Sequence, residues 1–267
     1  MVTFERLTKN KLQYFSSILD KKQRQASGLF HIEGLHLFEE FLKSGFEADW
    51  IVVHTDFIQQ HPQVANTIKN KFSAITYQAN SAEFRKISDT EQSQGIAAGI
   101  HERKNNDHFF STSAKELILA LDQISDPGNL GTIIRSADWF GVKKIVLNVS
   151  SVDVYNPKVI RASMGSIFRV ACRVLDLSRF LQEAKSQHYQ VYAASADSHN
   201  DQAINNVSTS CVIVIGNEAH GISENIKKLC SQEIGIPKYG GAESLNAAIA
   251  SGILMYEFSK QLYGKKH

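Results

Sequence analysis

Three short stretches, far apart in the chain, combine glycine, asparagine, serine and proline with a few charged side chains. They are DPGNLGTIIRSADWFG from Asp126, IGNEAHGIS from Ile215 and IPKYGGAESLNAAIA from Ile236. Each joins an apolar, strand-like run to the start of a helix. In an alternating β/α chain such corners gather at the carboxyl ends of the strands, where ligands bind. The three stretches are therefore predicted to form one site.

The first corner offers a helix start and an arginine. Asn129 is expected to cap the helix that follows the Asp126–Gly128 turn, and the free N–H groups of that helix suit an anion such as phosphate. A plain strand–turn–helix connection explains the same residues. Arg135 interrupts an apolar run, where it either extends to solvent or binds phosphate with its two-pronged guanidinium.

The other two corners supply a carboxylate and amides. Glu218 stands between Gly216 and Gly221, so it either contacts a ligand or interacts with the helix expected after Ser223. His220 is interpreted as a loop residue. In the third corner Ser244 is the expected N-cap, and that role alone would explain it. Asn246 is a mediocre helix former, and its amide is therefore a candidate for hydrogen bonds to a ligand.

Several common chemistries are excluded by what the chain lacks. It has neither a GxGxxG fingerprint after a strand nor a GxxxxGK[ST] loop, and no GxSxG elbow or Ser-His-Asp order stands out. Its three cysteines, Cys172, Cys211 and Cys230, have no CxxC spacing. They are expected to be reduced and mostly buried, with no metal site and no disulfide framework.

The periodicity of apolar residues predicts an α/β protein with a parallel sheet in its second half. Strands are expected at 28–32, 50–54, 74–78, 95–100, 116–122, 143–148, 168–175, 190–195, 211–216 and 233–237. Helices are expected at 9–24, 33–43, 56–71, 81–86, 129–140, 157–166, 178–188, 222–229 and from Leu245 onward.

The polar run HERKNNDHFFSTSAK at 101–115 indicates an exposed linker, although a polar edge loop within one domain is the alternative. The predicted division is a domain at 1–104, a linker at 105–115 and a second domain at 116–267. The terminal helix is apolar almost all round as far as Glu257. It is therefore buried either within its own domain or partly against a second copy of the chain, and a homodimer is one expectation.

The overall charge does not indicate a nucleic-acid partner, because the net charge of the 267-residue chain is only +2. Any basic footprint must be local, and a solvated helix face is the plainer explanation of each candidate. One candidate is the basic run at 9–24. The other comprises Lys158, Arg161, Arg169 and Arg173. No apolar run is long enough to cross a membrane and no secretion signal is visible, so a cytoplasmic protein is expected.

Taken together, the three stretches closely resemble the signature motifs of the SpoU/TrmH-type RNA ribose 2′-O-methyltransferases. The resemblance spans 116–260. Its matching positions are Asn129, Arg135, Gly216, Glu218, Gly221, Ile236, Pro237, Ser244, Leu245 and Asn246. The first hundred residues resemble, less closely, the accessory substrate-binding domain of that family, which has a ribosomal-protein L30e-like fold. The chain departs from the usual pattern at Lys238, where Met is common, and at 247–249, where a Val-rich run is more frequent.

The resemblance implies a deep trefoil knot, an obligate homodimer, S-adenosylmethionine as methyl donor and RNA as substrate, with ribosomal RNA favoured over tRNA. It places the cofactor among backbone groups of Gly216, Ile236 and Leu245, with Asn217 and Ser244 as neighbours.

In the family the residue matching Arg135 is assigned the role of proton acceptor. A guanidinium hardly deprotonates, so we expect Arg135 to anchor a phosphate and to stabilise the developing alkoxide. We assign Asn129, Glu218, Ser244 and Asn246 to positioning. The competing hypotheses are a noncatalytic RNA-binding protein of this fold and a Rossmann-type oxidoreductase, which lacks its glycine fingerprint.

Overall fold

The computed structural model describes residues 2–103, 109–111, 115–195, 207 and 209–264. The chain divides into two compact units. The first comprises Met1–Lys104 with Tyr155–Phe168, and the second comprises Asn105–Val154 with Arg169–His267. The segment 155–168 therefore packs with the first unit although it follows much of the second in sequence. The predicted three-part division at 104 and 116 stays a prediction.

A mixed five-stranded sheet, in the order β1-β4-β3-β5-β2, forms the centre of the first unit. Strands β1 and β3 run parallel to β4, whereas β5 is antiparallel to both β2 and β3. The strands are β1 (Glu5–Arg6), β2 (Leu29–Glu33), β3 (Ala48–His54), β4 (Thr76–Ala79) and β5 (Ile96–His101).

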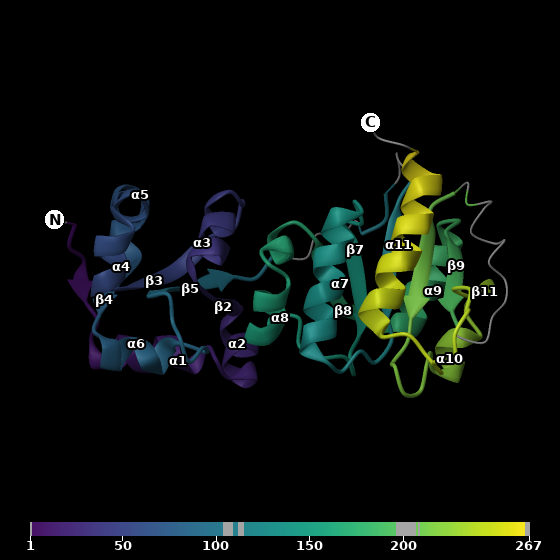
Figure 1. Ribbon diagram of the computed structural model, residues 1–267, viewed down its shortest axis with the longest axis horizontal. Helices are drawn as coiled ribbons and strands as arrows, with labels where there is room; N and C mark the ends of the chain where they lie inside the picture. The colour runs from purple at the N-terminus through teal and green to yellow at the C-terminus, as the bar shows by residue number, and fades with distance from the viewer. Residues whose placement is uncertain (1, 104–108, 112–114, 196–206, 208, 265–267) are drawn as a thin grey trace. The chain divides into compact units, whose positions relative to one another are not determined.

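Helices cover both faces of this sheet, with α1, α2 and α6 on one side and α3, α4 and α5 on the other (Figure 1). They are α1 (Lys9–Ser17), α2 (Lys21–Ser27), α3 (Leu35–Leu42), α4 (Thr55–Gln60), α5 (Pro62–Phe72) and α6 (Ser81–Ile87), with a 3₁₀ turn at Ser73–Ile75. A further helix, α8 (Pro157–Ala162), packs against β2 and is followed by the 3₁₀ turn Ser166–Phe168.

Two predicted helices of this unit were wrong in length, because each is two helices. The expected helix at 9–24 ends at Ser17, and Asp20 then caps α2 by accepting from the backbone N–H of Lys22 at 2.9 Å. The expected helix at 56–71 breaks at His61, since Pro62 cannot continue a hydrogen-bonded helix but fits the first turn of a new one.

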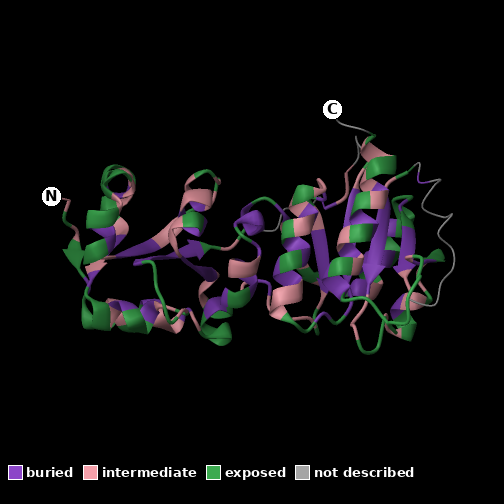
Figure 2. Ribbon diagram, in the orientation of Figure 1, coloured by how far each residue is buried: buried purple, intermediate pink, exposed green. Residues whose placement is uncertain are grey.

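The second unit is an open sheet of six parallel strands in the order β11-β9-β10-β6-β7-β8. This confirms the predicted fold class. The strands are β6 (Leu117–Leu121), β7 (Lys144–Asn148), β8 (Ala171–Leu175), β9 (Gln190–Ala194), β10 (Cys211–Ile215) and β11 (Gln232–Ile234). The central strands β6 and β10 are buried along their whole length, so near-continuous apolar runs are what they require (Figure 2).

Helices pack on both faces of the parallel sheet. Helix α11 (Ala247–Tyr263) packs on β6 and on α7 (Pro127–Trp139), beside which it lies in Figure 1. Helix α9 (Leu177–Ser186) packs on β7 and β9, and the short α10 (Glu224–Lys227) packs on α9. No described helix is both long and apolar enough to cross a membrane.

Helix α11 is apolar on two opposite sides. Its own domain buries Leu254, Met255 and Phe258, as the predicted apolar pattern requires. Four apolar side chains that point away from this core remain 38–56% exposed, namely Leu245 just before the helix and Ile249, Ile253 and Tyr256 within it. The chain alone therefore covers only one of the two apolar faces.

Of the three cysteines, Cys211 is fully buried, whereas Cys172 and Cys230 are half-buried, and none of them forms a disulfide in this structure. Burial raises the pKa of Cys230 to about 11, so its reactive thiolate is scarce near neutral pH. No group of three or more His, Cys, Asp and Glu within the described ranges is arranged to hold a metal ion.

A buried histidine makes the stability of the first unit depend on pH. His31 in β2 is 2% exposed, and its Nε2 has no hydrogen-bond partner. Burial lowers the pKa of His31 from 6.5 to about 4, with nearby Glu33 acting to raise it and Arg161 and Arg24 acting to lower it. Between these pH values the unfolded chain binds a proton that the folded chain does not. The stability associated with neutral His31 is thus complete above pH 6.5 and is lost as the pH falls toward 4.

Lowering the pH from 7 to 4 should reduce the free energy of unfolding of the first unit. We expect this reduction to be about 2 to 3 kcal/mol smaller in His31→Leu than in the parent. Trp50 and Trp139 are the only tryptophans, so in a Trp139→Phe background the fluorescence of Trp50 reports on this unit during urea titration. His220→Gln, which alters an exposed histidine, is the matched control. Equal pH dependence with and without His31 would contradict the assignment.

Candidate functional site

The three predicted corners lie at the carboxyl end of the parallel sheet, where two central strands are neighbours. Strand β10 pairs with β6 over its whole length, from Cys211 opposite Leu117 to Ile215 opposite Leu121. After β6 the chain continues to β7, toward one edge of the sheet. After β10 it continues to β11, at the opposite edge. The boundary between β6 and β10 is thus a topological switch point, the place where open α/β sheets usually bind ligands.

The first corner is capped by a different residue from the one predicted. Asp126, not Asn129, is the N-cap of α7, and its carboxylate accepts from the backbone N–H of Asn129 at 2.7 Å. Pro127 follows at the first helical position, where its missing N–H has no cost. Since Asp126 satisfies the helix end, the side-chain amide of Asn129 is available for other partners.

Those partners come from the other two corners. The Asn129 amide nitrogen donates to the carboxylate of Glu218, and the Asn129 carbonyl oxygen accepts from the amide nitrogen of Asn246 at 3.0 Å. Residues separated by 89 and 117 positions in the chain are thereby joined in one hydrogen-bonded chain of side chains. We call Asn129, Glu218 and Asn246 the corner triad. The predicted convergence of the three stretches is present in the structure.

Asn246 also begins the terminal helix. Its side-chain oxygen accepts from the backbone N–H groups of Ala248 at 2.9 Å and Ile249 at 3.3 Å. The prediction that Ser244 is the N-cap was wrong, because the helix begins two residues later than such a cap would place it. Ser244 and Leu245 are exposed in the segment leading to the helix.

The second corner is a tight backbone loop. Asn217 and Gly221 exchange both backbone hydrogen bonds, at 3.0 and 2.8 Å, and the Asn217 side chain accepts from the N–H of Ala219 at 2.8 Å. A side chain at Gly216 would overlap the backbone of Gly221 and Ile222, so only glycine fits there. His220 is exposed in this turn.

Sequence reasoning missed the group that holds this loop against the sheet. Asp122, directly after β6, is fully buried and accepts from the Ser223 N–H at 2.8 Å, the Ser223 hydroxyl at 2.6 Å and the Asn148 amide at 2.8 Å. Ser223 is the N-cap of α10 as predicted, yet its hydroxyl bonds to Asp122 and makes no cap bond. The available signal was an acid directly ending the apolar run LILAL.

Arg135 lies on α7 but is not joined to the corner triad. Its side chain is exposed. Within the described part of the chain it has no hydrogen bond or ion pair. In the second predicted basic cluster, two of the arginines already pair with carboxylates. Arg161 pairs with Asp89 and Arg169 with Asp138. Arg135 is thus the cation of the first corner that remains available to an anionic ligand.

The proposed cofactor-binding positions fit a ligand held mainly through the backbone. Gly216 and Asn217 are half-buried at the end of β10, and Ile236 is half-buried after β11, whereas Ser244 and Leu245 are exposed. The Gly240–Gly241 pair has open space around it. None of the five proposed positions carries a charge, so the available groups are peptide groups, the Asn217 amide and the Ser244 hydroxyl. Such a set can hold an adenosine and an amino-acid group through hydrogen bonds.

These features define a class of protein: an open parallel α/β domain with a ligand site of three corners at the switch point, joined in one chain to a smaller mixed-sheet unit. Comparison with known proteins identifies the family. The chain belongs to the SpoU rRNA Methylase family, whose model matches residues 116–256. The model of the MRM3-like substrate binding domain matches residues 9–98.

Similar proteins extend over almost the whole chain. A 23S rRNA (guanosine(2553)-2′-O)-methyltransferase of Bacillus subtilis, RlmP, is 30% identical, covering 96% of this chain and 98% of that protein. The AdoMet-bound rRNA methyltransferase of Sinorhizobium meliloti is 27% identical with a TM-score of 0.83, covering 96% of both chains. A TrmH-family structure from Porphyromonas gingivalis is 28% identical with a TM-score of 0.81, covering 96% of this chain and 99% of that one.

The family resemblance predicted from the motifs is therefore confirmed. The chain is an RNA methyltransferase, and its methyl donor is S-adenosylmethionine, the cofactor of this family.

The two roles of Asn246 can be separated by substitution. Asn246→Asp keeps an oxygen that caps α11 but removes the amide that donates to Asn129. We therefore expect nearly unchanged thermal stability, with methyl transfer reduced by roughly tenfold or more. Asn246→Ala removes both interactions and should also cost about 1 to 2 kcal/mol of stability.

Ser244→Ala is the matched control for the cap, because Ser244 makes no cap bond, and its stability should equal that of the parent. Calorimetric unfolding measures the stability, and single-turnover transfer of labelled methyl to RNA measures the activity. Full activity in Asn246→Asp would show that the amide bond between the corners is dispensable.

Proposed function

We propose that this enzyme transfers the methyl group of S-adenosylmethionine to a ribose 2′-hydroxyl of structured RNA, with ribosomal RNA as its substrate. The observation that carries the proposal is the corner triad, which joins the three motif-bearing loops at the switch point. The choice of ribosomal RNA is supported by the relative from Bacillus subtilis, which is named for a guanosine of 23S rRNA. An RNA substrate of this kind implies a cytoplasmic enzyme.

We assign cofactor binding to backbone groups at Gly216, Ile236 and Leu245, with Asn217 and Ser244 beside them. When bound, the cofactor supplies a methyl group made electrophilic by the positive charge on sulfur. Binding through backbone groups accounts for the absence of a charged binding signature in the sequence.

The polar residues then have separate roles. Asn129, Glu218, Ser244 and Asn246 position the loops and the ribose. Arg135 binds a phosphate of the RNA and stabilises the developing alkoxide on the 2′-oxygen. The hydroxyl proton leaves to that phosphate or to water, because the guanidinium already carries its five N–H donors and has no lone pair to accept a proton.

There are two alternatives. The first concerns the substrate: a tRNA substrate is compatible with the same site, since several relatives are named tRNA/rRNA methyltransferases. The second, a noncatalytic RNA-binding protein of this fold, conflicts with membership of a family of RNA methyltransferases. Calorimetry with S-adenosylmethionine checks this directly, and we expect binding at micromolar concentration.

Mass spectrometry of RNA from a strain lacking the gene tests the substrate. We expect the loss of one ribose methyl group from ribosomal RNA, restored when the purified enzyme and S-adenosylmethionine act on that RNA. Loss of the methyl group from tRNA instead would select the first alternative.

The role of Arg135 predicts a specific pH behaviour. Arg135→Ala should lower the single-turnover rate by about 10² to 10³. Arg135→Lys should recover only part of the rate, because an ammonium cannot bind a phosphate in bidentate fashion, and its pH profile should match that of the parent. Stopped reactions across pH 6 to 10 measure both effects. Full rescue by lysine, with a profile shifted to its amine, would instead identify the side chain as the base.

We also propose that the enzyme is a homodimer formed through the second unit, that this unit is threaded as a trefoil knot, and that the first unit is an L30e-like RNA-binding domain. The dimer is supported by the second apolar face of α11, with Ile249, Ile253 and Tyr256 exposed. A helix with apolar surface on opposite sides needs a second covering partner.

Ile249→Glu should convert the dimer to a monomer, because it places a charge in the middle of this face. Gln261→Glu adds the same charge at an exposed polar position of the same helix and serves as the control. Sedimentation equilibrium measures the mass. A monomeric parent, or a dimeric Ile249→Glu protein, would exclude this interface.

A further inference from the structure

The first unit contains a cavity that its sheet, a loop and a segment from beyond residue 150 form together. The cavity has a volume of about 270 Å³, and its lining includes Glu33, Leu37, Gln92, Gln94, Arg161 and Met164. Residues 33–94 come from the part of the chain that matches the substrate-binding family, whereas Arg161 and Met164 come from the segment 155–168 that packs onto it.

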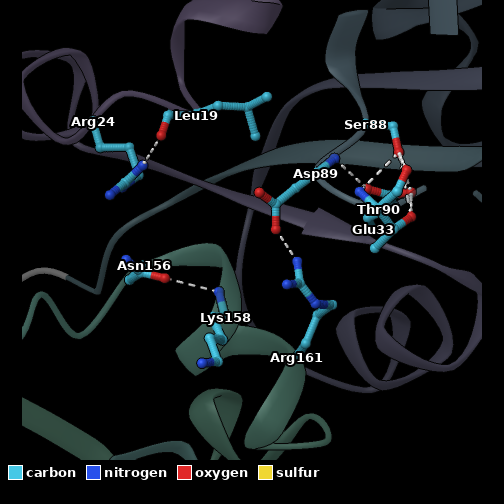
Figure 3. Close-up of polar contacts among 9 residues, drawn as sticks. All are labelled: Leu19, Arg24, Glu33, Ser88, Asp89, Thr90, Asn156, Lys158 and Arg161. Carbon is cyan, nitrogen blue, oxygen red and sulfur yellow. Dashed lines mark hydrogen bonds and ion pairs between the residues drawn. The ribbon is translucent and has the colours of Figure 1, made fainter. Parts of the chain in front are cut away.

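A buried carboxylate fixes one wall of the cavity. Glu33, at the end of β2, is 8% exposed and accepts from the Ser88 hydroxyl at 2.7 Å, the Thr90 hydroxyl at 2.6 Å and the Asp89 N–H at 2.8 Å (Figure 3). A carboxylate with three donors is well satisfied in a buried place. Loop 88–90 is thereby tied to the end of β2.

The same loop also carries Asp89, which contacts Arg161 of the cavity lining. Asp89 pairs with Arg161 of α8 (Figure 3), so the guanidinium is aligned while about a third of each side chain remains accessible. An arginine has five N–H donors. Those that do not face Asp89 remain for a molecule in the cavity.

The rim is held in an unfavourable backbone conformation. Met164 has φ 50°, which a side chain of its size rarely adopts, and it is followed by Gly165 with φ 87°. A side chain at Gly165 would come within 2.6 Å of the Glu40 side chain. Despite its apolar character Met164 is 42% exposed, and its carbonyl oxygen lies 3.3 Å from the Nε2 atom of His36. Strain of this kind persists where the surroundings impose it, and it concentrates at binding sites.

The lining is mostly apolar and also includes hydrogen-bonding side chains, among them Gln92, Gln94 and Arg161. Leu37 and the polarisable thioether of Met164 suit the face of a heterocycle. Gln94 accepts from the Leu35 N–H at 2.8 Å, which orients its amide so that the two N–H donors of the side chain are left over. Ligand cavities for larger organic molecules measure about 300 to 1,000 Å³, so this one suits a single ring system.

We propose that this cavity receives one unstacked base of the RNA substrate, whose face lies against Met164 and Leu37 and whose edge is read by Gln92, Gln94 and Arg161. Unpaired bases splayed from loops are the usual targets of sequence-specific RNA recognition. The inference rests on the proposed function in requiring an RNA substrate. It adds a specificity-determining site that belongs to the first unit, whereas the three motif-bearing corners belong to the second.

The test compares the double variant Gln92→Ala/Met164→Ala with Gln59→Ala, a glutamine exposed on α4. The probes are unmodified large-subunit rRNA made by transcription and, in parallel, unfractionated tRNA. Affinity for each RNA is measured without S-adenosylmethionine by filter binding, and KM and kcat are measured with it. We expect the double variant to raise both the RNA dissociation constant and KM by roughly five- to tenfold, with kcat and the calorimetric affinity for S-adenosylmethionine unchanged. Gln59→Ala should match the parent.

A second measurement locates the base directly. RNA substituted with 4-thiouridine is cross-linked to the parent enzyme by near-ultraviolet light, and mass spectrometry should find the cross-link on peptides containing 33–37 or 161–164. Unchanged RNA affinity in the double variant, together with cross-links elsewhere, would overturn the cavity assignment while leaving methylation intact. An enzyme that binds RNA through the cavity but methylates none would refute the proposed function instead. If the parent binds neither RNA, both proposals are wrong.

Discussion

The arrangement of the site depends on one buried carboxylate. Asp122 has no exposed surface, and a carboxylate removed from water is strongly destabilising unless donors surround it. Its three donors come from Asn148 at the end of β7 and from the backbone and hydroxyl of Ser223 after β10. The ends of three strands are consequently tied to one point. Since loss of any one donor would leave a charge partly unpaired, the loop from Gly216 to Ser223 has little freedom to move away from the sheet.

From that anchor the rest of the site follows by short links. The Asn217 side chain donates to the backbone carbonyl of Gln123 at 3.0 Å, one residue beyond Asp122, and so fixes the second corner to the first. Glu218, the next residue, then reaches the Asn129 amide, and Asn129 reaches Asn246. Each link uses a neutral amide or a backbone group. Arg135 takes no part in the contacts that order the loops. Its guanidinium therefore stays available to bind a phosphate.

Most of the fold could be predicted because strands and helices follow local apolar periodicity. The pattern located the six parallel strands and the terminal helix to within a few residues. Local pattern failed where tertiary partners decide. Asn129 and Ser244 are both good N-caps by type, yet Asp126 and Asn246 take those positions, because the Asn129 amide is used across the corners and the helix at 247 begins only where Asn246 can also reach Asn129.

The segment 155–168 shows a second limit of sequence reasoning. Its helix was expected to continue to 166, but it ends at Ala162, because Met164 and Gly165 adopt positive φ. Nothing in the local pattern indicated that α8 would pack against β2, about 130 residues earlier in the chain. Periodicity specifies which face of a helix is apolar, but the partner of that face is decided by long-range packing.

The charged residues show the same limit most directly. A run of basic residues in the sequence does not tell which side chains pair within the fold and which remain exposed to bind a ligand. Arg24, in the predicted basic run, is buried and donates to the backbone carbonyls of Ile18 and Leu19 at 3.0 and 2.6 Å, so it closes the end of α1 and is not a contact for RNA (Figure 3). Arg161 and Arg169 are paired with carboxylates. Arg135, which no charge cluster marked, is exposed and unpaired within the described chain. A nearly neutral protein can thus still bind RNA, because what determines the interaction with phosphate is the number of guanidinium groups that folding leaves available, and not the net charge.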